Sequence, residues 1–308
     1  NYLYAVGKIR SLETRLISLS YFFHFLYVER FEEIFHLFQE RGYSSLVDFG
    51  SLTKGLKEEL QKTYSLIVSL DKNNIFKDVV FLKNNIYNLK VCLKQKLFFK
   101  QQDTKRFFVS PTQVSYSEIL NIVKEEKWDK LSFPLSQWTE ELIKNKIEKP
   151  VEIDLFFDKK YILWVKSQLK FSSLLSNFYS KFIDWINIRT FFRIKEKDEF
   201  EKVFIPEGFL KKEVFFKVFK DSKEEIIKIF SSFGYEVSFD LEKFEKNFDD
   251  YLLSTILPAK NITFGVEPLF GFLIAKDREI MNIRNLLQGI HYKLPKDEIK
   301  NRFRNTYV

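Results

Sequence analysis

The stretch Asn282-Ile283-Arg284-Asn285-Leu286-Leu287 repeats a pattern that occurs twice earlier in the chain. The matching stretches are Asn88-Leu89-Lys90…Cys92-Leu93 and Asn187-Ile188-Arg189…Phe191-Phe192. Their leading asparagines are 99 and 95 residues apart. A period of about 100 residues is longer than that of the usual solenoid repeats, so we expect each copy to be a small unit of several helices.

A second pattern comes earlier in each copy. It reads Glu33-Ile34…Leu37-Phe38…Tyr43, then Glu118-Ile119…Ile122-Val123…Trp128, then Glu225-Ile226…Ile229-Phe230…Tyr235, with the aromatic residue ten positions after the glutamate. Tyr64, Tyr161 and Tyr251 then precede the three asparagines by 24, 26 and 31 residues. The repeated order predicts three homologous units, residues 1–105, 106–206 and 207–308, in a pseudo-threefold body.

Helical periodicity runs through most of the chain. Leu3, Val6 and Ile9 recur at a spacing of three, which is typical of an amphipathic helix. Glycine (9) and proline (7) are sparse among 308 residues, while apolar residues make up 45% and charged residues 30%. This composition predicts a globular all-α protein. Ser117 is expected to cap the helix that begins at Glu118.

The asparagine pattern places one buried stripe on each predicted helix. With the asparagine at zero and 100° per residue, positions −2, +1, +4 and +5 share a face. All twelve residues there are apolar: Ile86, Leu89, Cys92, Leu93, Trp185, Ile188, Phe191, Phe192, Ile280, Ile283, Leu286 and Leu287. Cations follow each asparagine by two positions and lie on one flank of the stripe: Lys90, Arg189 and Arg284.

Position −3 of this pattern is polar in every copy, although it falls inside the stripe. The residues are Asn85, Asp184 and Glu279, and with Asn88, Asn187 and Asn282 they form a set of repeated polar positions. A buried polar group without a partner costs about 1–3 kcal/mol. We therefore expect a hydrogen bond that locks a crossing helix of the same unit. A contact with another subunit is the alternative.

The net charge and the cysteine content indicate which partners and which cellular compartment this protein fits. The net charge of +8 is compatible with binding to nucleic acid, anionic lipid or an acidic protein, but basic and acidic residues are interspersed along the chain. Cys92 is the only cysteine, which excludes a disulfide framework and fits a reducing compartment. The longest strongly apolar run, Tyr21–Val28, is too short to cross a bilayer. We expect a soluble or peripheral protein.

Catalytic motifs are absent from the sequence. Gly50-Ser51-Leu52-Thr53-Lys54-Gly55 lacks the spacing of a nucleotide-binding loop. His24, His36 and His291 share no metal-ligand spacing. Cys92 lies on the buried stripe, where a nucleophile is not expected. We therefore predict no catalytic residue, no cofactor and no metal site, and a protein that is not an enzyme.

The C-terminal region carries a family resemblance. Glu267-Pro268-Leu269…Ala275-Lys276…Glu279-Ile280…Asn282-Ile283-Arg284…Pro295…Glu298-Ile299…Arg302-Phe303-Arg304…Tyr307-Val308 resembles the end of the C subunit of V/A-type rotary ATPases, the equivalent of the d subunit of the vacuolar proton pump. Tyr2…Tyr4-Ala5-Val6-Gly7-Lys8-Ile9-Arg10…Leu12-Glu13 is similar to the start of that family.

The resemblance implies a mechanical role. Three helical units would form a funnel that joins the central shaft of the ATPase head to the membrane rotor ring and transmits torque for ion transport. It implies peripheral attachment at the cytoplasmic face of the membrane, with no small-molecule substrate. Pseudo-symmetry nominates Lys90, Arg189 and Arg284 as partner-binding residues. A basic helical nucleic-acid-binding protein and a helical enzyme with an unrecognised site are the alternatives.

Overall fold

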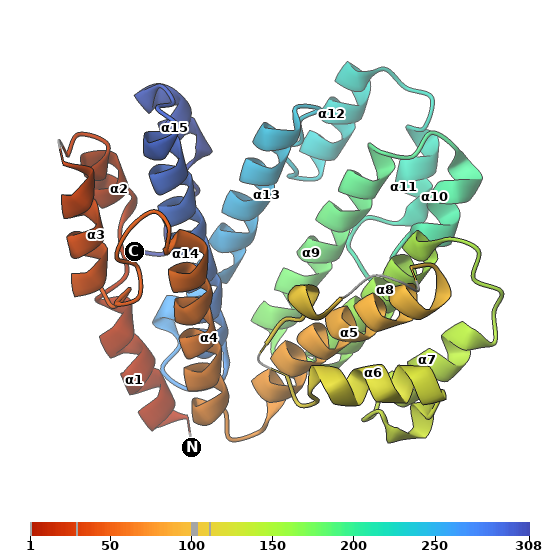
Figure 1. The fold of residues 1–308 in the computed structure, drawn as a ribbon. Coiled ribbons are helices and arrows are strands. Elements are labelled where there is room, and N and C mark those ends of the chain that lie inside the picture. Colours follow the sequence, from red (N-terminus) through yellow and green to blue (C-terminus); the bar gives the residue numbers. More distant parts are fainter. Residues whose placement is uncertain (1, 29, 100–103, 111) are drawn as a thin grey trace. The chain divides into compact units, whose positions relative to one another are not determined.

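The computed structural model describes residues 2–28, 30–99, 104–110 and 112–308 (Figure 1). This part of the chain consists of α-helices and short 3₁₀ turns and contains no β-strand. The prediction of an all-α fold is confirmed, and the scarcity of glycine and proline agrees with it, because both residues destabilise helix interiors.

Fifteen α-helices and three 3₁₀ turns form the described chain. They are α1 (Leu3–Glu13), α2 (Leu19–Phe25), α3 (Phe31–Glu40), α4 (Leu52–Leu70), α5 (Ile75–Leu97), η1 (Lys105–Phe107), α6 (Tyr116–Glu125), η2 (Trp128–Lys130), α7 (Leu135–Ile143), α8 (Pro150–Gln168), α9 (Ser173–Phe191), α10 (Lys197–Val203), α11 (Lys212–Lys217), α12 (Lys223–Ser232), α13 (Leu241–Ile256), η3 (Leu257–Asn261), α14 (Glu267–His291) and α15 (Lys296–Arg302).

The helices group into two compact units. The larger contains Asn1–Lys72 and Ser172–Val308, and the smaller contains Asn73–Phe171. These two units do not coincide with the three sequence copies. The asparagine helix α5 belongs to the smaller unit, whereas the asparagine helices α9 and α14 belong to the larger. The boundaries of the three homologous units and their funnel arrangement stay predictions.

Two of the glutamates that begin the second pattern complete helix caps. The Ser115 hydroxyl accepts a hydrogen bond from the Glu118 backbone N–H (3.3 Å), and the Glu118 carboxylate reaches back to the Ser115 N–H. Ser222 and Glu225 form the same capping box on α12. The expectation that Ser117 caps α6 is wrong, because this helix begins two residues earlier than expected.

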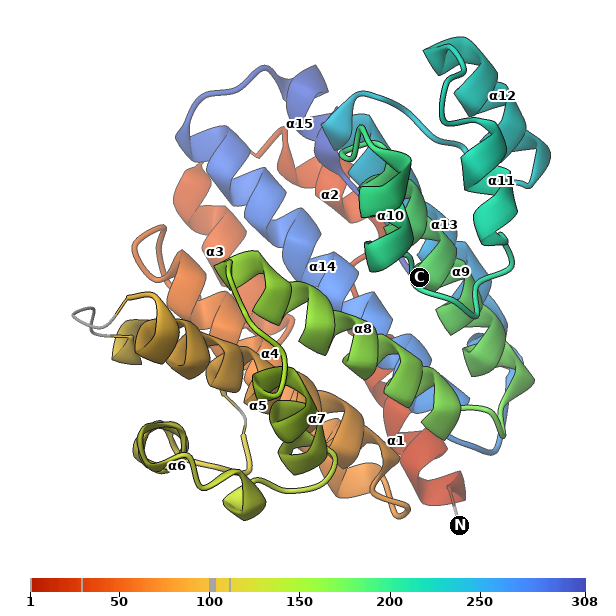
Figure 2. The ribbon, with the colours of Figure 1, turned by 90° about the vertical axis from the view of Figure 1, so that its right-hand side faces the viewer.

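In the larger unit, α14 is the central element. It packs against α1, α2, α4, α13 and α15 (Figure 2). Apolar residues of α2 and α3 meet those of α14 in one core, which includes Phe22, Phe38, Ile283 and Leu287. The N-terminal helices therefore share their core with a helix from the far end of the sequence.

A second aromatic core surrounds α9, which runs beside α13 (Figure 1). The Trp185 ring lies 4.9 Å from that of Phe244, and the Phe191 ring lies within 6 Å of the rings of Phe200, Phe215 and Phe230. Truncating one such buried ring to alanine typically costs about 3–5 kcal/mol.

The smaller unit packs α5 against α6 and α8, and α7 against α8. Its core includes Leu89, Leu93, Ile119, Ile153 and Phe157. Of the twelve stripe residues expected to be buried, eleven are buried and Phe192 is partly exposed. The helical period therefore identified the buried face of all three asparagine helices.

Candidate functional site

Asn88, Asn187 and Asn282 are each at most 1% exposed and lie inside long helices. Asparagine is seldom fully buried, and a helix leaves its side-chain amide without a partner in the helix itself. Each of the three amides must therefore find donors and acceptors on another segment.

Each asparagine binds both backbone groups of one residue. The Asn88 Nδ2 donates to the Val109 carbonyl oxygen (2.9 Å), and its Oδ1 accepts from the Val109 N–H (3.0 Å). Asn187 makes the same pair with Ile205 (2.8 and 2.9 Å), and Asn282 with Arg304 (2.9 and 2.8 Å). We call this arrangement an asparagine clamp. It fixes a non-helical residue that follows the asparagine by 18–22 positions against the helix.

The clamped residues were not identified from the sequence. Each follows a phenylalanine, in Phe108-Val109, Phe204-Ile205 and Phe303-Arg304. These phenylalanines come 20, 17 and 21 residues after their asparagines. This recurring residue was an available signal, but its variable spacing hides it from a search for a fixed period.

Position −3 also recurs as a bonded site in two of the three copies. The Asp184 carboxylate accepts from the backbone N–H groups of Phe209 and Leu210 (2.9 Å each) and from the Tyr235 hydroxyl (2.5 Å). The Glu279 carboxylate accepts from the Ile17 N–H (2.6 Å) and from the Tyr43 hydroxyl. Both acids are at most 2% exposed.

The two tyrosines are the aromatic residues of the second sequence pattern. We expected position −3 to lock a helix of its own copy, but Asp184 holds the tyrosine of the following copy. Glu279, in the last copy, holds Tyr43 of the first copy. The reason is that each asparagine helix packs on elements from the next copy, α9 on α13 and α14 on α4.

The first copy lacks this polar lock. The aromatic residue of the following copy is Trp128, which has no hydroxyl group. The Asn85 Nδ2 lies 3.5 Å from the Gln113 side-chain oxygen, at the limit of a hydrogen bond, and the buried Asn85 Oδ1 has no partner among the described residues. Ion pairs of Lys90 and Lys94 with Asp154, rather than a buried carboxylate at position −3, join α5 to α8.

Glu279 belongs to a buried charged cluster on α4 and α14. The Lys276 Nζ lies 2.8 Å from the Glu279 carboxylate, 3.3 Å from that of Glu59 and 4.4 Å above the centre of the Tyr43 ring. Burial, reinforced by the Glu279 charge, raises the pKa of Tyr43 well above its usual value. Removing one partner of such a buried pair leaves an uncompensated charge.

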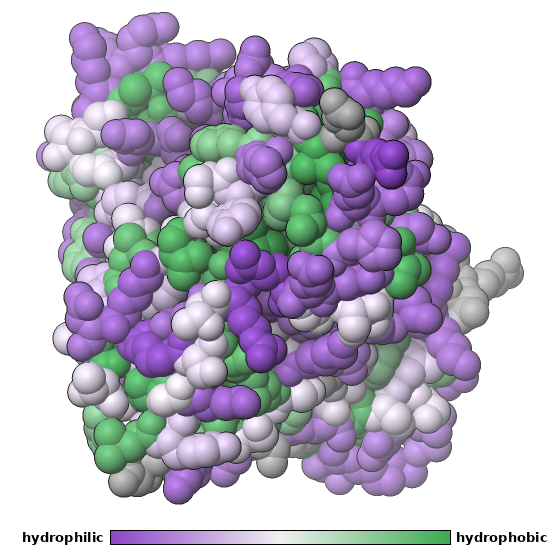
Figure 3. All heavy atoms as spheres, turned by 90° about the vertical axis from the view of Figure 1, so that its left-hand side faces the viewer, coloured by the Kyte–Doolittle hydropathy of each residue, from purple (hydrophilic) through white to green (hydrophobic). Residues whose placement is uncertain are grey.

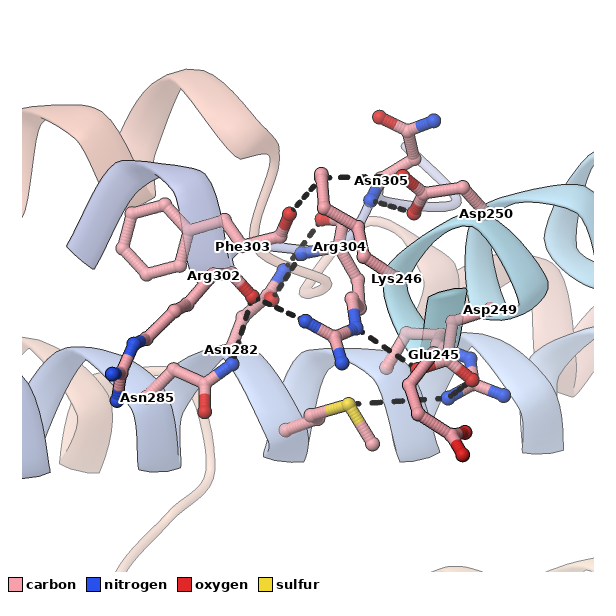
Figure 4. A network of polar contacts seen from close by, with 12 residues as sticks. Glu245, Lys246, Asp249, Asp250, Asn282, Asn285, Arg302, Phe303, Arg304 and Asn305 are labelled. Atoms are coloured by element: carbon pink, nitrogen blue, oxygen red, sulfur yellow. Dashed lines mark hydrogen bonds and ion pairs between the residues drawn. The ribbon is translucent and has the colours of Figure 1, made fainter. Parts of the chain in front are cut away.

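The segment after α15 is held by a polar network with α13 and α14 (Figure 4). The Arg304 guanidinium binds Asp249 (2.9 Å), which also pairs with Arg278 (2.6 Å). Asp250 accepts from the Asn305 N–H (2.6 Å), and Lys246 donates to the Phe303 carbonyl oxygen. Burial raises the pKa of Asp249, and the two arginines oppose that rise.

Glycine at position 271 admits the end of this segment. A Cβ added there would lie 2.7 Å from the Tyr307 hydroxyl and 3.1 Å from the Ala259 Cβ. The close approach of Tyr307 to α14 therefore requires the missing side chain. Glu267–Val308, the stretch that carries the family resemblance, is thus tied to itself and to α13.

The three cations nominated from pseudo-symmetry differ in their surroundings. Lys90 pairs with Asp154 (3.1 Å) and Asp158 (2.7 Å) of α8, and Arg189 lies 3.5 Å from Glu245 of α13. Arg284 is exposed on α14 and has no ion pair among the described residues. Two of the three are therefore engaged within the chain.

Chemically reactive arrangements are not found in the part of the chain that the structure describes. No group of three or more His, Cys, Asp or Glu side chains there could hold a metal ion. Cys92 is buried, and burial raises the pKa of its thiol to about 11. A hollow of about 280 Å³ beside it is lined by Cys92, Gln95, Lys96, Leu120, Val123 and Lys124.

None of the described helices is long and apolar enough to cross a bilayer.

Comparison with known proteins gives one consistent family. The model of the ATP synthase (C/AC39) subunit family matches residues 5–302. The C subunit of the A-type ATP synthase of Methanococcoides burtonii is 22% identical over 337 residues, covering 98% of this chain and 94% of its own length. The protein of the same name from Archaeoglobus fulgidus is 24% identical over 329 residues, covering 97% and 95%. The C subunit of the V-type sodium ATPase of Enterococcus hirae is 37% identical over 73 residues, which are 24% of this chain and 22% of that protein.

Proposed function

The chain belongs to the ATP synthase (C/AC39) subunit family, and from this premise we propose that it is a non-catalytic coupling subunit of a V/A-type rotary ATPase. It joins the central shaft of the ATPase head to the membrane rotor ring and carries torque between them. The observation that carries the proposal is the family match over nearly the whole chain, supported by end-to-end relatives named as the C subunit of an A-type ATP synthase.

The bonding pattern is suited to a part that transmits force. The asparagine clamps join residues 18–22 positions apart, and the Glu279 carboxylate joins segments as far apart as Ile17 and α14. Buried and fully satisfied polar networks resist rearrangement, and close-packed interiors deform little. A torque applied to one helix of the larger unit would therefore move its neighbours with it.

The proposal places the chain at the cytoplasmic face of the membrane, attached through the rotor ring. It assigns ATP chemistry to the head and ion transport to the ring. The buried acids Asp184 and Glu279 serve packing, because their oxygens accept from backbone N–H groups and tyrosine hydroxyls. They present no free carboxylate to a substrate.

Reconstitution of the ATPase with and without this chain tests the proposal. With the chain present, ATP hydrolysis should drive ion uptake into vesicles. Without it, the head should hydrolyse ATP while ion uptake falls to the background level. A complex purified through a tag on the ring that contains no copy of this chain would refute the proposal, and so would unchanged ion uptake in its absence.

Nucleic-acid binding was the alternative function that the sequence left open. No specific feature of the described residues supports it. Several of the basic residues, among them Lys90, Lys94 and Lys96, are paired with carboxylates. On the face drawn in Figure 3, hydrophilic and hydrophobic residues are intermingled. Binding to duplex DNA with an affinity that falls steeply with salt would reopen this alternative.

A further inference from the structure

The N-terminal end of α1 presents uncovered apolar side chains. Leu3 and Tyr4 are 58% and 76% exposed, and no other large hydrophobic residue of the described chain is as exposed as Tyr4. Side chains on an α-helix tilt toward its N-terminus, so these two lean toward the end of α1. Phe264 is 57% exposed and lies at the same end, because the centre of its ring is 6.3 Å from that of Tyr2. We call Leu3, Tyr4 and Phe264 the apolar apex.

The elements beneath the apolar apex are bonded to one another. The Tyr2 hydroxyl donates to the Asp71 carboxylate, just after α4 (2.8 Å). The Arg10 guanidinium donates to the carbonyl oxygens of Ala259 and Ile262 (2.8 and 2.9 Å), in the segment that leads to α14. The starts of α1 and α14 and the end of α4 therefore meet at one end of the larger unit (Figure 1). The apolar apex rests on a fixed base.

Two unpaired cations accompany the apolar apex. Lys8 follows Tyr4 by four residues and so lies on the same face of α1. Lys72 comes directly after Asp71, which binds the first residue of this end, Tyr2. Both lysines are exposed, and neither has an ion pair among the described residues. Their charges are therefore available to an anionic partner.

Exposed acids are absent from the segments that build this end. These segments are residues 2–12, 70–72 and 257–266. Their single carboxylate, that of Asp71, is buried and accepts from the Tyr2 hydroxyl. The outer surface of these segments thus combines apolar side chains with positive charge alone.

We propose that the apolar apex, with Lys8 and Lys72, enters the headgroup region of an anionic lipid bilayer. Aromatic side chains favour the boundary between headgroups and acyl chains, and lysines bind anionic headgroups while their stems lie along apolar surface. This inference goes beyond the proposed function and rests on it only for the presence of a membrane beside the chain.

The geometry favours a bilayer over a protein as the partner. The apolar apex is divided between the tip of α1 and the segment before α14, and a flat partner reaches both. Each side of a stable protein interface typically contributes about 20–30 residues, and three apolar side chains fall far short of that. A few interfacial side chains and nearby lysines are, by contrast, sufficient for a reversible membrane contact.

Vesicle flotation of the full chain tests the proposal. The chain should float with vesicles of equal parts phosphatidylcholine and phosphatidylglycerol, and much less with phosphatidylcholine alone. Tyr4→Ser and Phe264→Ser should each weaken binding to the anionic vesicles by at least about 10-fold, because each removes a large apolar group from the contact. Lys8→Gln and Lys72→Gln should each weaken it by about 5-fold, and high salt should do the same.

Matched controls lie on α12, at the opposite end of the larger unit (Figure 1). Phe233, just after α12, is 50% exposed, and Lys228 on α12 is exposed. Phe233→Ser and Lys228→Gln make the same chemical changes away from the apolar apex and should leave vesicle binding unchanged. Melting temperatures equal to that of the wild type establish that the exposed substitutions preserve the fold.

A fluorescent label gives a second reading that does not depend on affinity. Cys92 is the only native cysteine and is buried, so an introduced surface cysteine can be labelled selectively with a polarity-sensitive dye. The dye on Phe264→Cys should shift to the blue when anionic vesicles are added. The dye on Ser232→Cys, exposed on α12, should not shift.

The outcomes separate the membrane contact from the function. If the chain ignores anionic vesicles, or if Tyr4→Ser and Phe264→Ser bind them like the wild type, the membrane contact is refuted and the coupling function is unaffected. If these variants bind vesicles normally but lose affinity for the detergent-solubilised rotor ring, a protein covers the apolar apex, which overturns the assignment to lipid. If the apolar apex binds vesicles but ion uptake does not depend on the chain, the proposed function fails and the membrane contact stands.

Discussion

Replacing Asn282 by aspartate changes one atom of an asparagine clamp. The new carboxylate still accepts the Arg304 N–H, but it places an oxygen 2.9 Å from the Arg304 carbonyl oxygen, where Asn282 donates. The partly buried Arg304 carbonyl oxygen loses this donor, at about 1–3 kcal/mol. The charge is also buried in a site that is 0% exposed. We expect Asn282→Asp to cost about 3 kcal/mol.

Differential scanning calorimetry measures this loss. For a domain of this size, about 3 kcal/mol lowers the melting temperature by roughly 6–12 °C. The drop should belong to the larger unit, which contains Asn282, and Asn301→Asp should produce no comparable drop because Asn301 is exposed. Protonation of the introduced carboxyl restores a donor, so the gap from the wild type should narrow between pH 7 and pH 4.

A melting temperature within about 2 °C of the wild type would refute the role assigned to the clamp. An equal deficit at pH 7 and pH 4 would refute the mechanism, because it would mean that the lost donor is not the cause. In either case the repeated asparagines would be ascribed to helix packing alone.

Three further outcomes follow from the buried groups. Asn85→Leu should leave the melting temperature unchanged or raise it, since the orphaned Asn85 oxygen disappears, whereas Asp184→Leu should lower it by several degrees; equal losses would contradict the difference between the copies. The Cys92 thiol should react with Ellman's reagent at pH 8 at least about 100-fold more slowly than free cysteine until denaturant opens the smaller unit, and immediate reaction of the native protein would contradict its burial. Burial raises the pKa of Tyr64 from 10.0 to about 12, so the folded state favours the neutral phenol. The contribution of this preference to stability is full below pH 10 and is lost as the pH rises to about 12. Tyr64→Phe should therefore flatten the fall in melting temperature between pH 10 and pH 12, and an unchanged slope would contradict this account.

Helical periodicity made the fold class and the buried face predictable. The stripe at −2, +1, +4 and +5 depends only on geometry along one helix, and it placed residues such as Ile188 and Leu286 correctly in the core. The resemblance of both ends to one family is confirmed by the match over residues 5–302. Both results rest on short-range or whole-chain patterns that need no knowledge of packing.

The partners of the polar residues could not be predicted in the same way. The bond between Glu279 and the Ile17 N–H spans 262 residues, and a backbone donor leaves no mark on the sequence. Likewise, Val109 is clamped through its main chain, so its side chain carries little information. The pairing of Lys90 with Asp158, 68 residues away, depends on which helices meet, and only the coordinates supply that.

The shared core of α2, α3 and α14 has a consequence for biosynthesis. The early helices leave the ribosome with their apolar faces uncovered, and Glu279 follows Ile17 by 262 residues. At about 5–20 residues per second, this interval lasts roughly 13–50 s. Throughout it, Phe22 and Phe38 have no permanent neighbours from the distal half, and a nascent-chain chaperone has time to occupy them. Arrest of translation before α14 should therefore yield polypeptides that remain chaperone-associated.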